Sequence, residues 1–524
     1  MARHPHIVIT GVEHWGHTRP LCAFAIKAVQ MRDVYVTLFS HPHVYEKVKK
    51  EMSRGFNGPG GSERLAQFVR VVAVDCLAVG ATRRETMSLE LLRYFESFMA
   101  LYTRLLQEKP VTCYLTQTEF AGVPAPNMVV LDLIVGPLGP MLRNYPKNEA
   151  KLAVFCSGMA AYCYSCFAPS ENGGPLHFKE AAFLEAERTG RDVNDVAEDI
   201  VYTYGDGITQ MPGLPKMYLW EFDPQDTTAL TKGVALGALR LAMYDTYDSC
   251  DELIMTSTEA YEPVALAATR EWFAETGRGV WAVGPLALSD SKEAREGEVA
   301  QSARGTEIKK FMDDVVEKYG EKKMIYMSFG SGFWPPVPDK YEAFIDVLIE
   351  KRIPFIFSYA SPIAQLSDAF RARVENSDVG FLSQFSPQQT ILAHPAVGWF
   401  ISHCGQSSTL ESVSAGVPII AWPFHVDQPA NAVHLTDNLE IAYELYEVRT
   451  GNGTKPTYRT GKAPVGTLEA LRAEAHEVLD KAFGEDGARK RANVQKLRAQ
   501  ILRAWDKGGS AEVDMTKLLD RALA

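Results

Sequence analysis

Residues 385–428 hold most of the side chains whose types and spacing could bind a phosphorylated ligand. Within them, Ala396 to Ser402 is apolar and rich in β-forming residues, as a buried strand is. His403-Cys404-Gly405 then makes a turn in which the glycine lets the backbone approach a ligand. Residues 406–408 open a helix whose unpaired N–H groups favour an anion. These patterns predict a phosphate site at the start of a helix.

Polar and aromatic side chains accompany this predicted phosphate site. An isolated strand–turn–helix unit with serine near its start is most often only a capped helix. Here Glu411 lies one turn further along, where a carboxylate could hold sugar hydroxyls, and Asp427-Gln428 follows the next predicted strand on the same sheet edge. Phe385 offers a flat face to a base. Together these features predict a binding site for a nucleotide sugar.

The stretch resembles the signature box of the family 1 UDP-sugar glycosyltransferases, which plants use on small-molecule acceptors. The match covers the whole box without a gap and implies that UDP is bound. Position by position, it implies uracil stacking by Phe385 in place of a Trp, nucleoside contact by Gln388, ribose binding by Glu411, diphosphate binding by His403 and Ser408, and sugar-hydroxyl binding by Asp427 and Gln428. Gln406 replaces the usual Trp and Ser407 the usual Asn, which leaves the identity of the sugar open. Ser331, in the motif SFGS, resembles a family residue near the donor phosphates, although a plain turn serine is the alternative.

Glycosyl transfer to a hydroxyl needs a base, because a protonated alcohol is a poor nucleophile. His17 is a candidate because it follows the first predicted strand and an imidazole with a pKa of ~6.5 is largely neutral at cell pH. Its GHxxP context resembles that of the family's catalytic histidine. The resemblance also implies that Asp132, at the end of the strand MVVLD, is the carboxylate that orients this histidine. Glu119 is the alternative partner acid, and His14 is the alternative base.

Strand and helix patterns alternate through both halves of the chain, which indicates an α/β protein. Together with the resemblance, this predicts two Rossmann-like domains that face each other across a cleft, the arrangement called GT-B. The expected parts are an N-terminal acceptor-binding domain (1–286), a polar interdomain linker (287–310), a C-terminal UDP-sugar-binding domain (311–505) and a C-terminal helix that could pack back on the N-terminal domain (506–524).

Other local patterns have plainer structural interpretations. The helix after His17 is expected from Leu21 to Met31, and Lys47 to Arg64, rich in Gly, Pro, Lys and Arg, is interpreted as a mobile, solvated loop. His41-Pro-His43 is interpreted as a solvated turn. Cys163-x-x-Cys166 has the spacing of half a zinc site but no second pair, so two packed residues on one helix are expected.

The resemblance implies an inverting enzyme that moves a hexose, with glucose expected, from a UDP-sugar to a hydroxyl of a small apolar acceptor. The UDP-sugar is then a co-substrate rather than a bound cofactor, and no metal is expected because the chain has no Asp-x-Asp pair. One alternative is a sterol or lipid glucosyltransferase acting at membranes. Another is a non-catalytic UDP-sugar binder, which would dispense with His17 and Asp132. The absence of G-x-G-x-x-G and G-x-S-x-G argues against a dinucleotide oxidoreductase and a serine hydrolase.

Bulk composition sets further limits. The chain has 524 residues, of which 46% are hydrophobic and 23% charged, as in an ordinary globular protein. A formal net charge of -11 disfavours nucleic acid as a partner. No apolar run approaches the roughly 18 residues of a membrane helix, and the N-terminus enters a strand at once, so no signal peptide is expected. Eight cysteines in apolar segments indicate reduced residues and a cytoplasmic protein. The natural acceptor and the oligomeric state are not determined by these patterns.

Overall fold

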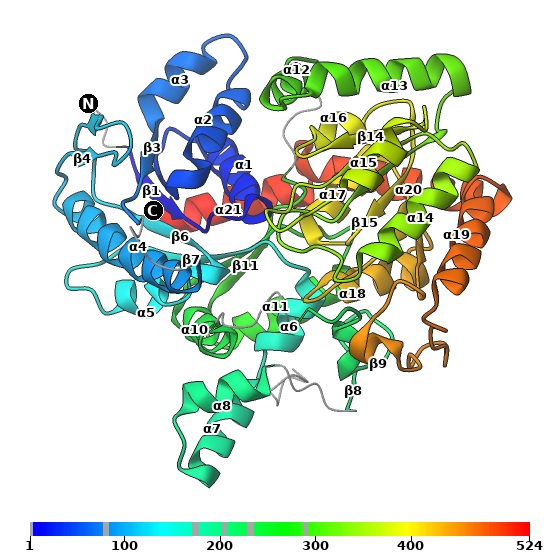
Figure 1. Cartoon of the computed structure of the whole chain (residues 1–524). Coiled ribbons are helices and arrows are strands. Elements are labelled where there is room, and N and C mark those ends of the chain that lie inside the picture. The colour runs from blue at the N-terminus through cyan, green and yellow to red at the C-terminus, as the bar shows by residue number, and fades with distance from the viewer. Residues whose placement is uncertain are drawn as a thin grey trace.

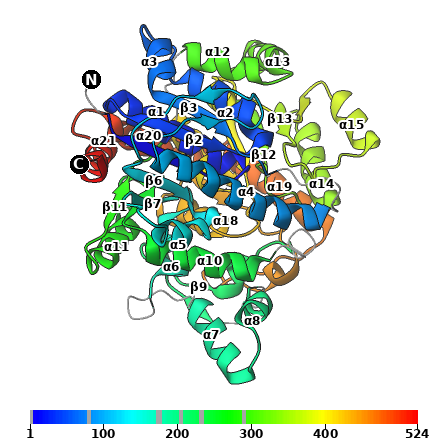
Figure 2. The ribbon, with the colours of Figure 1, turned by 90° about the vertical axis from the view of Figure 1, so that its left-hand side faces the viewer.

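The computed structural model describes residues 4–76, 83–169, 178–201, 207–227, 235–286 and 292–523, with the backbone alone described at 83–89, 292–294 and 301. Two parallel sheets, each packed between helices, form two lobes (Figure 1). Figure 2 turns the molecule so that the N-terminal lobe faces the viewer. The predicted α/β class with two Rossmann-like domains is therefore confirmed.

The N-terminal domain is built on a seven-stranded parallel sheet in the order β11-β10-β7-β6-β1-β2-β3. Its strands are β1 (His6–Thr10), β2 (Tyr35–Ser40), β3 (Val69–Ala73), β6 (Met128–Asp132), β7 (Lys151–Cys156), β10 (Glu252–Met255) and β11 (Gly279–Ala282). The chain goes from β1 to β2 on one side, whereas β6 pairs with β1 on the other, so the strand order reverses between them. Ligands of open α/β sheets bind at the carboxyl ends of strands beside such a reversal. His17 follows β1 and Asp132 ends β6, so both lie at this point.

Helices cover both faces of this sheet (Figure 1). The helices of this domain are α1 (Trp15–Met31), η1 (Pro42–Val44), α2 (Tyr45–Arg54), α3 (Gly61–Phe68), α4 (Arg83–Leu106), η2 (Leu133–Val135), α5 (Leu138–Arg143), α6 (Ala160–Phe167), α7 (Phe178–Thr189), α8 (Val193–Ile200), η4 (Leu219–Phe222), α10 (Leu236–Ser249) and α11 (Pro263–Ala274). Of these, α7 and α8 project away from the sheet at the bottom of Figure 1. Two small antiparallel pairs complete the domain: β4 (Val111–Thr112) with β5 (Glu119–Phe120), and β8 (Ile208–Thr209) with β9 (Met217–Tyr218).

The C-terminal domain has a six-stranded parallel sheet in the order β14-β13-β12-β15-β16-β17. Its strands are β12 (Met324–Ser328), β13 (Phe355–Ser358), β14 (Gly380–Ser383), β15 (Val397–Ser402), β16 (Ile419–Ala421) and β17 (Ala442–Glu444). Here the strand order reverses between β12 and β15. The turn that holds Ser331 follows β12, and His403 follows β15, so the predicted diphosphate residues lie at the second reversal point.

The remaining helices surround this sheet or connect the two domains. They are α12 (Lys292–Gln301), α13 (Gly305–Tyr319), α14 (Pro338–Glu350), α15 (Asp368–Glu375), α16 (Gln388–Leu392), α17 (Gln406–Ala415), α18 (Gln428–Val433), η5 (His434–Asn438), η6 (Gly451–Thr454), α19 (Leu468–Ala482), α20 (Glu485–Leu502), η7 (Arg503–Trp505) and α21 (Ser510–Leu523). Residues 287–291 of the expected linker lie outside the described ranges, and α12 forms most of its remainder. Helix α21, red in Figure 1, returns to the N-terminal domain, where Met515 and Leu518 pack in one cluster with Ile7.

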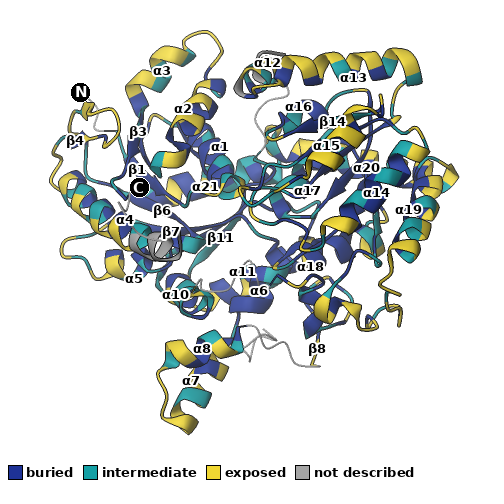
Figure 3. Cartoon of the chain, viewed as in Figure 1, coloured by how far each residue is buried: buried dark blue, intermediate teal, exposed yellow. Residues whose placement is uncertain are grey.

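The strands form the buried interior of both lobes (Figure 3). All eight cysteines are buried and free, and Cys163 and Cys166 belong to the apolar cluster around α6, which confirms their interpretation as packed residues. None of the helices in the described ranges combines the length and apolar character that crossing a bilayer requires.

Two predictions of local structure are wrong. Helix α1 begins at Trp15, not at Leu21, so His17 lies in the first turn of a helix rather than in a loop. The segment from Lys47 to Arg64 is not a solvated loop, because α2 and part of α3 occupy it. Tyr45, Val48 and Met52 recur at helical spacing on α2 and are buried against the domain core.

Candidate active site

The predicted base and acid meet at the reversal point of the N-terminal sheet. Nδ1 of His17 lies 2.9 Å from Oδ2 of Asp132 and 2.9 Å from Oγ of Ser157. Asp132 is fully buried, and its Oδ1 accepts the N–H of Ile134 at 2.9 Å, which fixes the orientation of the carboxylate. Asp132 therefore favours the tautomer with the proton on Nδ1. Nε2 of His17 has no hydrogen-bond partner among the described residues and is left to accept a proton.

The electrostatic surroundings of His17 also favour its charged form. Burial opposes protonation of His17, but the charge of Asp132 and the hydrogen bond to it outweigh burial and raise the pKa of the imidazole. The alternative acid and the alternative base lie in different surroundings. Glu119 is an exposed residue of the β4–β5 pair, and His14 is an exposed residue at the N-cap of α1. The structure thus brings Asp132, and not Glu119, to His17.

The C-terminal domain supplies a hydrogen-bond donor to the first turn of α1. Pro20 has no amide hydrogen, so the carbonyl of Gly16, four residues earlier, lacks the usual helical donor. The hydroxyl of Ser407 donates to this carbonyl at 3.0 Å. Ser407 is one of the two departures from the family box, and it joins the helix of His17 directly to the start of α17.

His403 is held at the mouth of the C-terminal sheet by two glycines. A Cβ on Gly330 would lie 2.8 Å from the imidazole, and a Cβ on Gly405 would lie 2.6 Å from its Nε2. Burial lowers the pKa of His403 to about 4, so the ring is neutral at pH 7. Nδ1 of His403 is buried and lacks a partner among the described residues. A ligand oxygen at this ring would satisfy a polar atom that the protein leaves unpaired.

The predicted nucleoside residues form a connected set. Nε2 of Gln388 donates to Oε2 of Glu411 at 2.7 Å and to Oγ of Ser408 at 3.2 Å. The ring of Phe385 faces α2 of the other domain, with Nζ of Lys47 4.7 Å from its centre. Ser331 follows Gly330 and is half-buried, and its side chain makes no hydrogen bond with the residues that the structure describes.

The predicted sugar-binding pair is buried near the predicted base and its partner acid. Oδ2 of Asp427 accepts the N–H of Met159 from the N-terminal domain at 3.0 Å. Burial raises the pKa of Asp427 to about 6, so this carboxylate is ionised at neutral pH. The side-chain oxygen of Gln428 accepts the N–H of Phe424 at 2.9 Å. Gln406 is buried too, and its amide oxygen has no partner among the described residues. The second departure from the family box thus places an unpaired acceptor beside the predicted sugar site.

Residues missed by the sequence analysis also reach the site. Arg19, two residues after His17, reaches the C-terminal domain and donates to Oε1 of Glu411 at 3.2 Å. The same guanidinium contacts Glu51 of α2 and Glu298 of α12. The helical spacing of the buried residues on α2 could have predicted that helix. Nothing in the local sequence links Arg19 to residues of the other domain.

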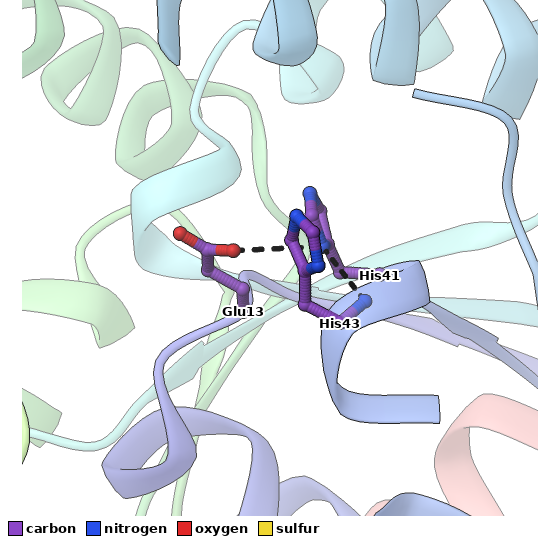
Figure 4. Close-up of side chains that lie close together, drawn as sticks. All are labelled: Glu13, His41 and His43. Carbon is purple, nitrogen blue, oxygen red and sulfur yellow. Dashed lines mark hydrogen bonds and ion pairs between the residues drawn. The ribbon is translucent and has the colours of Figure 1, made fainter. Parts of the chain in front are cut away.

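His41 and His43, interpreted as a solvated turn, lie near Glu13 at the carboxyl ends of β1 and β2 (Figure 4). In the part of the chain that the structure describes, this is the one group of three residues whose potential metal-ligand atoms lie within 4.8 Å of one another. Nδ1 of His41 accepts the N–H of His43 and lies 3.5 Å from Oε2 of Glu13. The group borders a small pocket lined by residues of β1 and β2, including Thr10 and Ser40.

Comparison with known proteins identifies the class. Residues 296–443 match the family model described as UDP-glucoronosyl and UDP-glucosyl transferase. The chain is 29% identical over 532 residues to the UDP-glycosyltransferase eriJ of Hericium erinaceus, covering 98% of each chain. It is 27% identical to UDP-glycosyltransferase 73C1 of Arabidopsis thaliana, covering 98% of this chain and 96% of that one. Among solved structures, a UGT transferase from Siraitia grosvenorii in complex with UDP aligns with a TM-score of 0.69 at 17% identity, over 99% of this chain and 100% of that one.

The fold is therefore the two-domain GT-B arrangement. Residues 296–443 thus match the family of UDP-glucoronosyl and UDP-glucosyl transferases, and the relatives of similar length are UDP-glycosyltransferases. The protein is a glycosyltransferase whose co-substrate is a UDP-sugar.

Proposed function

We propose that this enzyme transfers a hexose, with glucose as the expected sugar, from a UDP-sugar to a hydroxyl of a small apolar acceptor with inversion at the anomeric carbon. The observation that carries the mechanism is the 2.9 Å contact between Nδ1 of His17 and Oδ2 of Asp132. This contact leaves Nε2 of His17 as the atom that takes the acceptor proton.

The step is a single displacement. Nε2 of His17 takes the hydroxyl proton while the acceptor oxygen forms a bond to the anomeric carbon, and the bond from that carbon to the UDP oxygen breaks. Asp132 stabilises the imidazolium that forms, because it lies against the other ring nitrogen. The electron pair leaves with UDP, so an α-linked donor gives a β-glycoside. The proton on His17 is then released to solvent or to the departing diphosphate.

The departing diphosphate needs positive potential rather than a base. The neutral ring of His403 can donate one hydrogen bond, and the N–H groups and Ser408 hydroxyl at the start of α17 can donate others. We place the uracil against Phe385 and the ribose against Gln388 and Glu411. The sugar hydroxyls then meet Asp427 and Gln428, whose buried carboxylate and amide suit polyol recognition.

The acceptor class is supported by the names of two relatives. They are UDP-glucose flavonoid 3-O-glucosyltransferase 6 of Fragaria ananassa and Anthocyanidin 3-O-glucosyltransferase 5 of Manihot esculenta, which match about half of the chain at 29% and 28% identity. The test is UDP release with UDP-glucose and a panel of phenols, flavonoids, terpenoids and sterols. Activity on sterols in vesicles alone would favour the lipid alternative. UDP binding without turnover on any acceptor would favour a non-catalytic binder.

The base assignment has its own test. His17→Ala should abolish acceptor-dependent UDP release while leaving UDP affinity close to that of the wild type, because His17 contacts Asp132 and Ser157 and no predicted donor residue. Equal rates of UDP release by the two proteins would show that His17 is not the base.

A metal-free mechanism follows from the same set of donors. His403 and the helix start supply the diphosphate contacts that a cation supplies in other transferases. We expect turnover to persist in EDTA, measured as UDP release. Loss of activity in EDTA with recovery on adding manganese would contradict this expectation.

A further inference from the structure

Arg19 lies at the centre of a buried ion cluster between the two domains. Its Nε donates to Glu51 at 2.8 Å, and its Nη2 donates to Glu298 at 2.8 Å and to the side-chain oxygen of Gln389 at 2.9 Å. Its Nη1 donates to Oε1 of Glu411 at 3.2 Å. Four hydrogen bonds thus use most of the five N–H groups of one guanidinium, and the partners come from α2, α12, α16 and α17.

The cluster is largely removed from solvent. The side chains of Arg19 and Glu411 are 12% and 14% exposed, and those of Glu51 and Glu298 are 1% and 6% exposed. Arg54 provides a second guanidinium, 2.6 Å from Glu51. Arg19 is therefore the cation that contacts both Glu298 and Glu411, and a charge at this depth is costly unless it is paired.

The pKa shifts follow this geometry. Burial raises the pKa of Glu411, and Arg19 opposes that rise, with help from the amides of Gln388 and Gln389. Burial also disfavours ionisation of Glu298, but Arg19, Arg54 and a bond from Thr390 hold its pKa below the ordinary value. Arg19 thus favours the ionised form of two carboxylates whose charges repel each other.

The arrangement leaves Glu411 able to accept one more hydrogen bond. Oε1 already accepts from Arg19 and Gln389, whereas Oε2 accepts from Gln388. An ionised carboxylate has about four acceptor positions, so one remains on Oε2. A ribose hydroxyl can occupy that position without displacing a protein contact.

Arg19 also connects this carboxylate to the catalytic histidine. His17 and Arg19 are two residues apart on the first turn of α1, so they point to nearly opposite sides of the helix. His17 contacts Asp132 of its own domain, and Arg19 contacts Glu411 of the other domain. The ion pair therefore joins Glu411 directly to the helix that carries His17.

We propose that Arg19 is a positioning residue that pairs with Glu411, orients it for the ribose hydroxyls of the donor and joins that contact to the helix that carries His17. This inference rests on the proposed role of Glu411 in ribose binding. It goes beyond that role because it assigns ribose discrimination to a residue of the opposite domain.

The experiment compares the binding of UDP and of 2′,3′-dideoxyuridine diphosphate by titration calorimetry on the full-length chain. Wild type should prefer UDP by about tenfold or more, because a hydrogen bond to a charged carboxylate is lost with the dideoxy ligand. Arg19→Met should lose most of that preference, through weaker binding of UDP and little change for the dideoxy ligand. Arg32→Met is the matched control, because Arg32 makes an exposed pair with Asp520 at the far end of the same helix.

A second variant controls for misfolding caused by an unpaired buried charge. Arg19→Gln combined with Glu298→Gln removes one positive and one negative charge, so the buried cluster keeps its net charge. It should still lose the preference for UDP. Equal weakening of both ligands in these variants would overturn the proposal, since it would show support of the fold alone. Absence of the preference in wild type would instead refute the ribose role of Glu411, and with it this inference, while leaving UDP binding itself intact.

The pH dependence of UDP affinity separates positioning from support of the fold. Glu411 faces Arg19 of α1, Glu298 of α12, Gln388 and Gln389 of α16, and Tyr326 of β12. Without Arg19 the pKa of Glu411 rises further, so the UDP affinity of Arg19→Met should fall more steeply than that of wild type as the pH is lowered. A parallel pH profile for the two proteins would contradict the proposal.

Discussion

Replacing Asp132 by Asn tests the catalytic pair with little change in shape. Asn keeps the volume of Asp and can keep the bond from the N–H of Ile134. It removes the charge that stabilises the imidazolium of His17, and its amide favours the wrong tautomer of the ring. A hydrogen bond to a charged group contributes about 1.5–3 kcal/mol, which corresponds to about a 10- to 150-fold loss of kcat.

The same substitution predicts a shift of the pH profile. In wild type, Asp132 raises the pKa of His17 against the effect of burial. The active base is the neutral ring, so activity is lost as the pH falls through this raised pKa. In Asp132→Asn the pKa of His17 falls, and the acidic limb of kcat/KM must move to lower pH although the plateau is lower.

The assay is acceptor-dependent UDP release between pH 5 and pH 9 with UDP-glucose in excess. Asp520→Asn is a matched control, because Asp520 forms an exposed pair with Arg32 and should change neither the plateau nor the limb. An unchanged plateau, or an acidic limb that moves to higher pH, would refute the assignment of His17 and Asp132 as base and acid.

Two other substitutions have defined outcomes. Gln406→Trp with Ser407→Asn restores the usual box residues and should change sugar preference or turnover, measured with a panel of UDP-sugars, more than UDP affinity; an equal loss of UDP binding would contradict this. Val426 has a φ of 62°, a conformation that costs an L-residue about 1–2 kcal/mol, and is 37% exposed. Val426→Asn should therefore raise the free energy of unfolding by about 1 kcal/mol in urea, whereas Val465→Asn, at an exposed site without positive φ, should not. A stability equal to or below that of wild type at 426 would contradict the strain argument.

The sequence predicts those helices and strands of the site whose ends are marked by local residues. Helix α17 begins at Gln406 as predicted, and Gly416 ends it in a left-handed conformation with a φ of 73°. Strand β6 spans the predicted MVVLD, and β1 and β6 bring His17 and Asp132 to the same reversal point.

The errors arise where distant residues complete a local structure. The sequence alone does not show that α1 begins at Trp15. Pro20 cannot donate to the carbonyl of Gly16, and the hydroxyl that donates to it comes from Ser407 in the other domain. The ion cluster of Arg19 draws its partners from four other helices, so no local pattern contains it. Helix α2 is different. Its buried residues recur at helical spacing in the sequence, but the Gly- and Lys-rich composition of the segment favours a loop.

The central claim is inverting transfer from UDP-glucose with His17 as the base. The most direct measurement is the anomeric configuration of the product, read from the proton coupling of the new glycoside in NMR, for wild type and His17→Ala under the same conditions. The account predicts a β-glucoside from wild type, with the large coupling of two axial protons, and no product above background from His17→Ala. An α-glucoside, or the same yield of β-glucoside from both proteins, would contradict it.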